Sequence, residues 1–304
     1  MMKTYRLGDF PIKVPKKRAF IKVPDGEIGL HCCAVVCGAR GSGKTVAVRS
    51  KLHHLKAEGL ADRVFLISPT AVSNSEMWAG LVEEEDIFSE MTNESVIKII
   101  DIVEAEAKEW KEYEEKLRLY KLWKKLLKKQ TPINEIDPEL LLEFFEAGIY
   151  DLDEMEEEPK SKYGHKPVLH LVLDDCQSSK LFVPSTHNKL LNATIRHRHL
   201  GDGLGLSMWF LVQSYSTNSG LPKAIRDNST LLILFPMKNG NNVMKVIEEI
   251  GGNIDEETFS KVYEYAIKDG DHDFLVIEFT PSKKKFTFRK NWDTALIPDA
   301  EFDK

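Results

Sequence analysis

The stretch Cys33-Ala34-Val35-Val36-Cys37-Gly38-Ala39-Arg40-Gly41-Ser42-Gly43-Lys44-Thr45 decides how this chain folds. Its first five residues are apolar and predict a buried strand at 33–37, and the pattern of 44–58, which ends at Gly59, predicts a helix. Between them lies Gly-x-x-x-x-Gly-Lys-Thr, whose glycines let the backbone turn its N–H groups inward around an anion. A strand, this loop and a helix together predict a phosphate-binding loop, or P-loop, in an α/β fold.

Each part of the loop has a physical role at a nucleotide. Lys44 supplies a mobile cation for the β- and γ-phosphates, and Thr45 supplies a hydroxyl group for Mg²⁺. The helix that follows directs the partial positive charge of its N-terminus at the phosphates. The expected nucleotide-binding residues are Gly38, Ala39, Arg40, Gly41, Ser42, Gly43, Lys44, Thr45 and Val46.

Four further apolar runs alternate with helical patterns, which is typical of a mostly parallel sheet buried on both faces. They lie at 64–67, 168–173, 207–212 and 231–235. A late hairpin is expected from 274–277 and 286–288, with a turn at 281–283. We therefore expect an α/β P-loop NTPase core with a mostly parallel central sheet flanked by helices, a helical insertion and a C-terminal β-hairpin.

Polar residues close two of these runs. Asp174 and Asp175 follow the run at 168–173, and ligands gather at the carboxyl ends of strands in such sheets. We expect this strand to adjoin the strand of the loop, with Asp174 as a metal ligand and Asp175 as the base or orienter of the attacking water. Gln213 closes the next run, where its amide is expected beside the γ-phosphate; a structural polar residue at a strand end is the alternative.

Three arginines are candidates for a finger that reaches the nucleotide of an adjacent subunit and neutralises charge in the transition state. Arg196 and Arg198 lie in Thr194-Ile195-Arg196-His197-Arg198-His199-Leu200, and Arg226 lies in Leu221-Pro222-Lys223-Ala224-Ile225-Arg226. Each is equally compatible with a surface position or a position that faces DNA.

Residues 83–165 interrupt the alternation of strands and helices. Apolar residues at three- and four-residue steps from Val96 to Leu127 predict one face of a long helix, and Asp137-Pro138 predicts the start of a shorter helix over 139–147. We expect a charged helical hairpin here. The expected parts are a basic N-terminal arm, 1–29, a P-loop ATPase core, 30–82 and 166–304, and the insertion, 83–165.

Composition sets broader limits. The chain has 304 residues, a net charge of −6 and four cysteines, which are too few and too poorly spaced for a disulfide framework or a zinc site. Cys33, Cys37 and Cys176 lie in apolar, strand-like surroundings and are expected to be buried thiols. It shows neither a signal-peptide pattern nor an apolar run long enough to span a membrane, so we expect a soluble protein with no membrane partner. Residues 1–22 are locally basic, and such an arm can meet nucleic acid even on an acidic protein.

Several stretches taken together resemble the genome-packaging ATPases of large double-stranded DNA viruses and virophages, the poxvirus-type branch of the FtsK/HerA superfamily. Apart from the insertion, the resemblance covers residues 30–240. The stretches that carry it are Val35 to Thr45, Phe65 to Thr70, Leu171 to Asp175, Arg196 to His199, and Gln213 followed by Leu221-Pro222 and Arg226-x-Asn228.

The resemblance implies an ATP-driven motor that acts as a homo-oligomeric ring, a pentamer or hexamer, and moves double-stranded DNA into a preformed viral capsid at its portal vertex. It places the protein in the host cytoplasm, in a viral factory, or on the virion. It also implies ATP and Mg²⁺ as cofactors; the choice of ATP over GTP comes from the resemblance alone, because the loop contacts only phosphates.

By the same pattern, Lys44 and Thr45 bind ATP and Mg²⁺, Asp174 holds the metal, Asp175 activates water and Gln213 senses the γ-phosphate. As the finger acting in trans, the pattern favours Arg196 or Arg198 over Arg226. Many members carry Glu at the position of Asp175, and the role of the large insertion cannot be taken from the family.

Two other classes of protein stay open. A small P-loop nucleotide or nucleoside kinase requires an acceptor pocket and an arginine-bearing lid, and works as a monomer or dimer. A nucleotide-dependent scaffold or switch would bind a partner through its long helix. The Asp174-Asp175 pair, Gln213 and the basic arm favour hydrolysis coupled to movement, with the arm and the lysine-rich segment 121–129 contacting DNA or, alternatively, the capsid.

Overall fold

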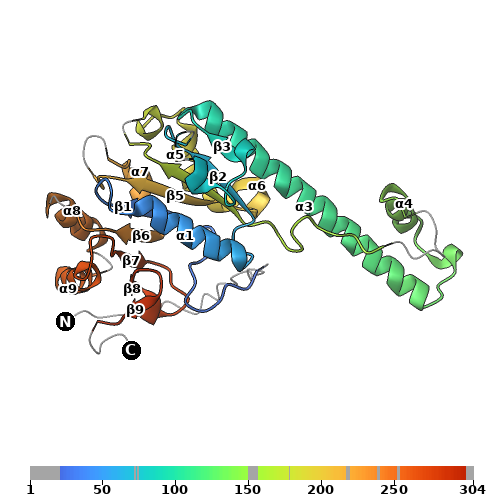
Figure 1. The fold of residues 1–304 in the computed structure, drawn as a ribbon. Coiled ribbons are helices and arrows are strands. Elements are labelled where there is room, and N and C mark those ends of the chain that lie inside the picture. Colours follow the sequence, from blue (N-terminus) through green and yellow to red (C-terminus); the bar gives the residue numbers. More distant parts are fainter. Residues whose placement is uncertain are drawn as a thin grey trace, which may run out of the picture.

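The computed structural model describes residues 21–71, 73, 75–149, 157–177, 179–216, 220–237, 240–251 and 254–298. A nine-stranded sheet forms its centre, in the order β3-β2-β4-β5-β1-β6-β7-β8-β9 (Figure 1). The strands from β3 to β6 in this order run parallel, and β7, β8 and β9 are antiparallel. The strands are β1 (Cys33–Cys37), β2 (Arg63–Ile67), β3 (Ile87–Phe88), β4 (Leu169–Asp174), β5 (Ser207–Val212), β6 (Leu231–Leu234), β7 (Leu275–Glu278), β8 (Phe288–Lys290) and β9 (Thr294–Leu296).

Helices cover both faces of the sheet, because successive residues of each buried strand point to opposite faces. Val36 packs with Leu52 of the first helix on one face, whereas Val35 belongs to the apolar cluster of the other face together with Val103 and Phe259. The helices are α1 (Lys44–Ala57), α2 (Ser75–Trp78), α3 (Asn93–Lys128), α4 (Pro138–Glu146), α5 (Lys189–Arg196), α6 (Leu200–Gly203), α7 (Lys223–Asp227), α8 (Gly240–Ile250) and α9 (Glu256–Ile267).

The five apolar runs expected as strands are confirmed as β1, β2, β4, β5 and β6. The late hairpin is confirmed as β7 and β8, which pair Ile277 with Phe288. Its second strand begins two residues later than expected, because Phe286 lies in a short 3-10 turn, and β9 then adds a third strand. Neither the two-residue strand β3 nor the helices α8 and α9 had been expected.

The segment expected as a separate insertion, 83–165, belongs in its first part to the core. β3 adds a strand beside β2, and the first half of α3 packs on the sheet through residues such as Val96 and Val103. The expected start at residue 83 is therefore too early. The physical reason is that the apolar stripe of α3 is continuous, so the sequence alone gives no mark of where the helix stops covering the sheet.

The second half of α3 leaves the core and carries α4 at its far end (Figure 1). There Leu119 and Trp123 of α3 meet Phe144 of α4 and Ile149 in a small apolar cluster of their own. Asp137 caps α4 as expected, because its carboxylate accepts the N–H of Glu139 at 2.9 Å. The second half of α3 and α4 thus form a helical projection with a small apolar core of its own.

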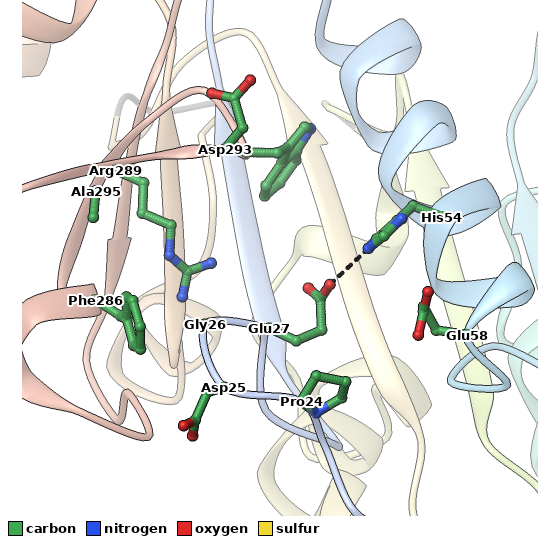
Figure 2. A pocket seen from close by; sticks show the side chains of 11 residues that line it. Pro24, Asp25, Gly26, Glu27, His54, Glu58, Phe286, Arg289, Asp293 and Ala295 are labelled. Atoms are coloured by element: carbon green, nitrogen blue, oxygen red, sulfur yellow. Dashed lines mark hydrogen bonds and ion pairs between the residues drawn. The ribbon is translucent and has the colours of Figure 1, made fainter.

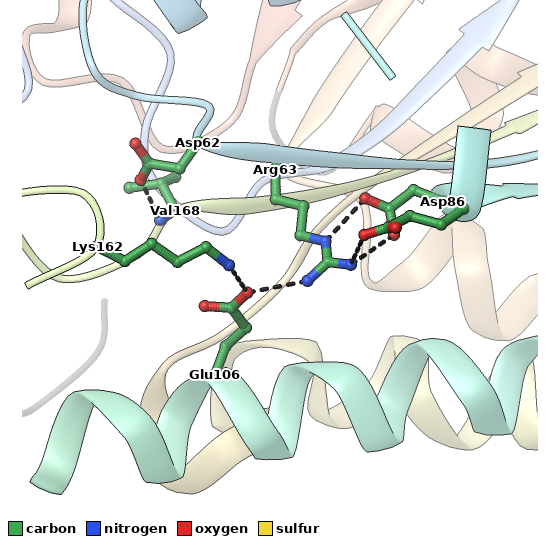
Figure 3. A network of polar contacts seen from close by, with 7 residues as sticks. Asp62, Arg63, Asp86, Glu106, Lys162 and Val168 are labelled. Carbon is green, nitrogen blue, oxygen red and sulfur yellow. Dashed lines mark hydrogen bonds and ion pairs between the residues drawn. The ribbon is translucent and has the colours of Figure 1, made fainter. Parts of the chain in front are cut away.

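A network of charges fixes the base of α3 to the sheet (Figure 3). The guanidinium group of Arg63 on β2 donates two hydrogen bonds of 2.8 Å to Asp86, which is only 1% exposed. A third N–H group of Arg63 donates to Glu106 of α3 at 2.9 Å, and Lys162 donates to the same carboxylate at 2.8 Å. Because buried carboxylates are stable as charges only when they are paired, this network holds β2, α3 and the segment before β4 in one arrangement.

The cysteines of the chain are buried in the core. All four cysteines are free and buried, which confirms the expectation for Cys33, Cys37 and Cys176, and burial raises the pKa of the Cys32 thiol to about 12. In the described part of the chain, no helix combines the length and the apolar character needed to cross a membrane. Residues 1–20 of the expected basic arm and residues 150–156 of the expected insertion lie outside the described residues.

A buried histidine in β4 makes the stability of the fold depend on pH. His170 donates from Nε2 to Leu60 O at 2.9 Å and accepts the indole N–H of Trp209 at Nδ1, at 3.0 Å, so both ring nitrogens are engaged in the neutral form. Burial lowers the pKa of His170 from 6.5 to about 4. The unfolded chain therefore binds a proton that the folded chain excludes, and stability falls as the pH drops from about 6.5 towards 4.

For this one group the loss is about 2 kcal/mol between about pH 7.5 and pH 5. We expect urea unfolding at the two pH values to show this loss, and His170→Gln, which keeps a donor and an acceptor but cannot titrate, to show a loss smaller by that amount. Equal losses in the two proteins would contradict the assignment.

Candidate active site

The loop after β1 has the backbone that an anion cradle needs. Gly41 and Gly43 have positive φ values of 78° and 97°, which side-chain-bearing residues rarely adopt. Gly38 must lack a side chain for another reason, since a Cβ atom there would lie 2.6 Å from Cβ of Phe235. α1 begins directly after Gly43, so the N-terminus of a 14-residue helix faces the loop.

Lys44 extends across the mouth of this loop. Its ammonium group donates to Gly38 O at 2.8 Å and to Ala39 O at 3.0 Å. Burial lowers the pKa of Lys44, and the negative charge of Asp174 opposes that shift. Arg40, like Val46 at the start of α1, is exposed, so the loop presents its outer residues to solvent.

A contact that sequence reasoning missed supports the loop from outside. His272, in the connection between α9 and β7, donates from Nδ1 to Ser42 O at 3.1 Å. The same ring lies against Gly43, where an added Cβ atom would meet it at 3.4 Å. No local pattern could have predicted this contact, because it joins residues 230 positions apart.

The strand order corrects one expectation about the carboxylate pair. The strand that ends in Asp174 does not adjoin the loop strand, because β5 pairs with β1 on one side and with β4 on the other. The register aligns Cys37 with Val212 and Leu211 with Asp174, so all three strands end at the same edge of the sheet. Gln213 therefore leaves the sheet between the loop and the two aspartates. This is the fold of a P-loop NTPase.

Asp174 nevertheless reaches the loop helix across that intervening strand. Its Oδ2 accepts the hydroxyl of Thr45 at 3.0 Å. Burial raises the pKa of Asp174, and the hydrogen bond from Thr45 opposes that shift. A hydroxyl and a carboxylate side by side are hard oxygen ligands, and Mg²⁺ takes one or two of these together with waters and phosphate oxygens. The residues present fit a magnesium ion at this point.

The second carboxylate faces the amide at the end of β5. The side-chain NH₂ of Gln213 donates to Asp175 Oδ1 at 3.1 Å, and Asp175 is exposed with a positive φ of 56°. Gln177, which sequence reasoning did not single out, positions Gln213: it accepts the backbone N–H of Gln213 at 2.7 Å and donates to Ser214 O at 3.1 Å. Asp175 and Gln213 thus form one polar unit beside Asp174.

The arginines fall into two groups. Arg196 and Arg198 are exposed at the end of α5 and in the turn after it. His197 between them hydrogen-bonds at 2.9 Å to the carbonyl of His31, which precedes β1. Both arginines therefore lie at the amino-terminal edge of the sheet, opposite their own phosphate loop, and neither can serve the nucleotide of its own chain.

Arg226 is held within its own chain. Its guanidinium group pairs with Glu249 of α8 at 2.8–3.1 Å and lies over the ring of Tyr215, 5.5 Å from its centroid. The side chain is only 13% exposed. A finger in trans would have to break this pair first, whereas Arg196 and Arg198 are exposed.

Comparison with known proteins adds solved structures of similar fold. No protein-family model and no curated protein matches the chain. The genome packaging NTPase B204 of Sulfolobus turreted icosahedral virus 2, solved with ATP-gammaS, is 12% identical, with a TM-score of 0.43 over 88% of this chain and 100% of that one. The pCW3 conjugation coupling protein TcpA is 15% identical, with a TM-score of 0.40 over 90% and 68% of the two chains.

The ATPase domains 2 and 3 of EssC from Geobacillus thermodenitrificans are 14% identical, with a TM-score of 0.42 over 90% of this chain and 41% of that one. Likeness at these scores transfers no activity, so the function of this chain has to rest on its own site.

Proposed function

We propose that this chain hydrolyses ATP with Mg²⁺. The observation that supports this most strongly is the placement of two polar pairs at one edge of the sheet, Thr45 with Asp174 and Asp175 with Gln213. The first pair supplies two oxygen ligands that would hold a metal ion beside the phosphates. The second suits a water molecule that attacks the γ-phosphate, whereas a kinase would need a pocket for an acceptor at this place.

In this proposal the loop N–H groups and the ammonium group of Lys44 bind the β- and γ-phosphates. Thr45 and Asp174 would hold Mg²⁺, which would supply positive charge at the phosphate oxygens. Asp175 accepts a proton from the attacking water or orients it, and Gln213 fixes the Asp175 carboxylate by donating to it. Gln177 holds the backbone of Gln213 in that position.

We further propose that hydrolysis drives movement along double-stranded DNA, in a ring of copies that packages a viral genome into its capsid. The motif resemblance supports this, as does the basic arm of residues 1–22 on a chain of net charge −6. The exposed arginines Arg196 and Arg198 also support it, because they lie away from their own phosphate loop and could reach the nucleotide of a neighbouring copy. A motor grips phosphates rather than bases, so the contact depends on salt.

The test is the steady-state ATPase rate with and without duplex DNA across a salt series, with Lys44→Ala as the blank. We expect DNA to stimulate hydrolysis at low salt and the stimulation to decline steeply as salt rises, because bound counterions are released on binding. If hydrolysis occurs but DNA stimulates it at no salt concentration, the proposal of ATP hydrolysis stands and the proposal of a DNA motor is overturned.

A further inference from the structure

A second pocket lies away from the nucleotide site, between the chain segment before β1, the second half of α1 and the strands β8 and β9 (Figure 2). Its volume is about 420 Å³. Phe286 and Trp292 give it apolar walls, and Arg289 and Glu27 lie at its inner side. Nothing in the proposed hydrolysis uses these residues.

Arg289 forms the buried inner wall of this pocket. It is 3% exposed, and its Nη2 pairs with Glu278, but Nε and Nη1 have no hydrogen-bond partner among the described residues. Figure 2 shows the guanidinium group pointing into the pocket. The Nε and Nη1 atoms are themselves enclosed, so Arg289 shapes the inner wall of the pocket and leaves recognition to the groups nearer its mouth.

The rim of the pocket is acidic. Glu27 is already paired with Lys51 and His54, and Asp25 is paired with Lys283. Glu58 and Asp293 are exposed acids that also line the pocket. Apolar walls and surplus negative charge together suit an extended peptide that carries both aliphatic and basic side chains.

The chain contains such a peptide twice. Ile-Lys-Val-Pro occurs at 21–24 and again at 12–15. In the described copy, Ile21 and Val23 pack against the apolar cluster under α1, Lys22 is exposed, and Pro24 lines the pocket itself. The copy at 12–15 is followed by Lys16-Lys17-Arg18, so it carries positive charge that complements the acidic rim.

We propose that residues 12–15 of a neighbouring copy of this chain bind in this pocket. The aliphatic side chains of Ile12 and Val14 would lie against the aromatic walls, and Lys13 would face the acidic rim. A neighbour is favoured over the same chain because residues 16–20, Lys-Lys-Arg-Ala-Phe, contain none of the residues that make a tight reversal. The contact would link the copies of an assembly without involving the nucleotide.

The test uses disulfide formation in the full-length chain, whose native cysteines are all buried. One preparation carries Val14→Cys and the other carries Ala295→Cys, an exposed position that lines the pocket. After mixing and mild oxidation we expect a disulfide-linked dimer of the two chains, formed at least about tenfold faster than with a distant partner cysteine, because docking raises the effective concentration of the two thiols.

The matched control replaces Ala295→Cys by Val183→Cys, which is 58% exposed and follows a segment packed on the opposite face of the sheet. A free peptide of residues 10–18 should suppress the specific dimer, and Glu58→Lys with Asp293→Lys should slow it. Equal yields at 295 and 183 would overturn the proposal. A single chain that carries both Val14→Cys and Ala295→Cys would also overturn it if its disulfide formed only within that chain, because residues 12–15 would then bind the pocket of their own chain.

Discussion

Asp175→Asn is expected to lower the turnover rate of ATP hydrolysis by about 10²–10⁴-fold, because an amide cannot accept the proton of the attacking water. Nucleotide binding should persist, since Lys44, Thr45 and Asp174 are unchanged and the amide is of the same size. Turnover is measured in the steady state, and binding is measured separately by titration with a fluorescent ATP analogue. Normal turnover in Asp175→Asn would remove Asp175 from the chemistry.

Asp175→Glu is the matched variant, because it keeps the carboxylate and lengthens its reach. We expect it to retain much more activity than Asp175→Asn. Mixing Asp175→Asn chains with Arg196→Ala or Arg198→Ala chains tests the finger in trans: a chain with an intact carboxylate would receive its arginine from the other kind, and some activity should return. Mixtures of both kinds that stay inactive would exclude these arginines as fingers.

Lys44→Ala is expected to abolish measurable hydrolysis and to weaken ATP binding, because it removes the cation that faces the β- and γ-phosphates. Loss of one such electrostatic contact lowers turnover by about 10²–10³-fold, and Lys44 also contributes to binding. Asp174→Asn should reduce hydrolysis to a similar degree through the metal. Binding titrations at several Mg²⁺ concentrations separate the two, since only Asp174→Asn should shift the Mg²⁺ dependence.

The thermal stability of Asp174→Asn gives a second test of the metal site. Burial raises the pKa of Asp174, so its charge is unfavourable in the folded chain without metal, and Asp174→Asn should unfold at the same or a higher temperature than the unmodified chain. A catalytic defect in a more stable protein cannot be ascribed to unfolding. Asp174→Asn that is both active and destabilised would contradict its placement at the metal.

Much of the fold could be predicted because its signals are local. The apolar runs of the parallel sheet stand out between helical patterns, and the glycines with positive φ in the loop are required by the loop itself. For the same reason, the pairing of Thr45 with Asp174 could be anticipated from two motifs, each of which ends or follows a strand.

What could not be predicted depends on long-range placement. The position of β5 between β1 and β4 is set by pairings that leave no mark in either strand's sequence. The support that His272 gives the loop and the way Gln177 holds Gln213 come from residues with no motif around them. The arginines show the same limit, since Arg226 lies in a matching motif and yet pairs with Glu249 of its own chain.

The most direct test of the account is a crystal or cryo-EM structure with a non-hydrolysable ATP analogue and Mg²⁺. We expect a magnesium ion next to Thr45 and Asp174, and a water held near Asp175 and Gln213 in line with the γ-phosphate. A map in which the metal is bound while Asp174 and Asp175 point away from the nucleotide would contradict it.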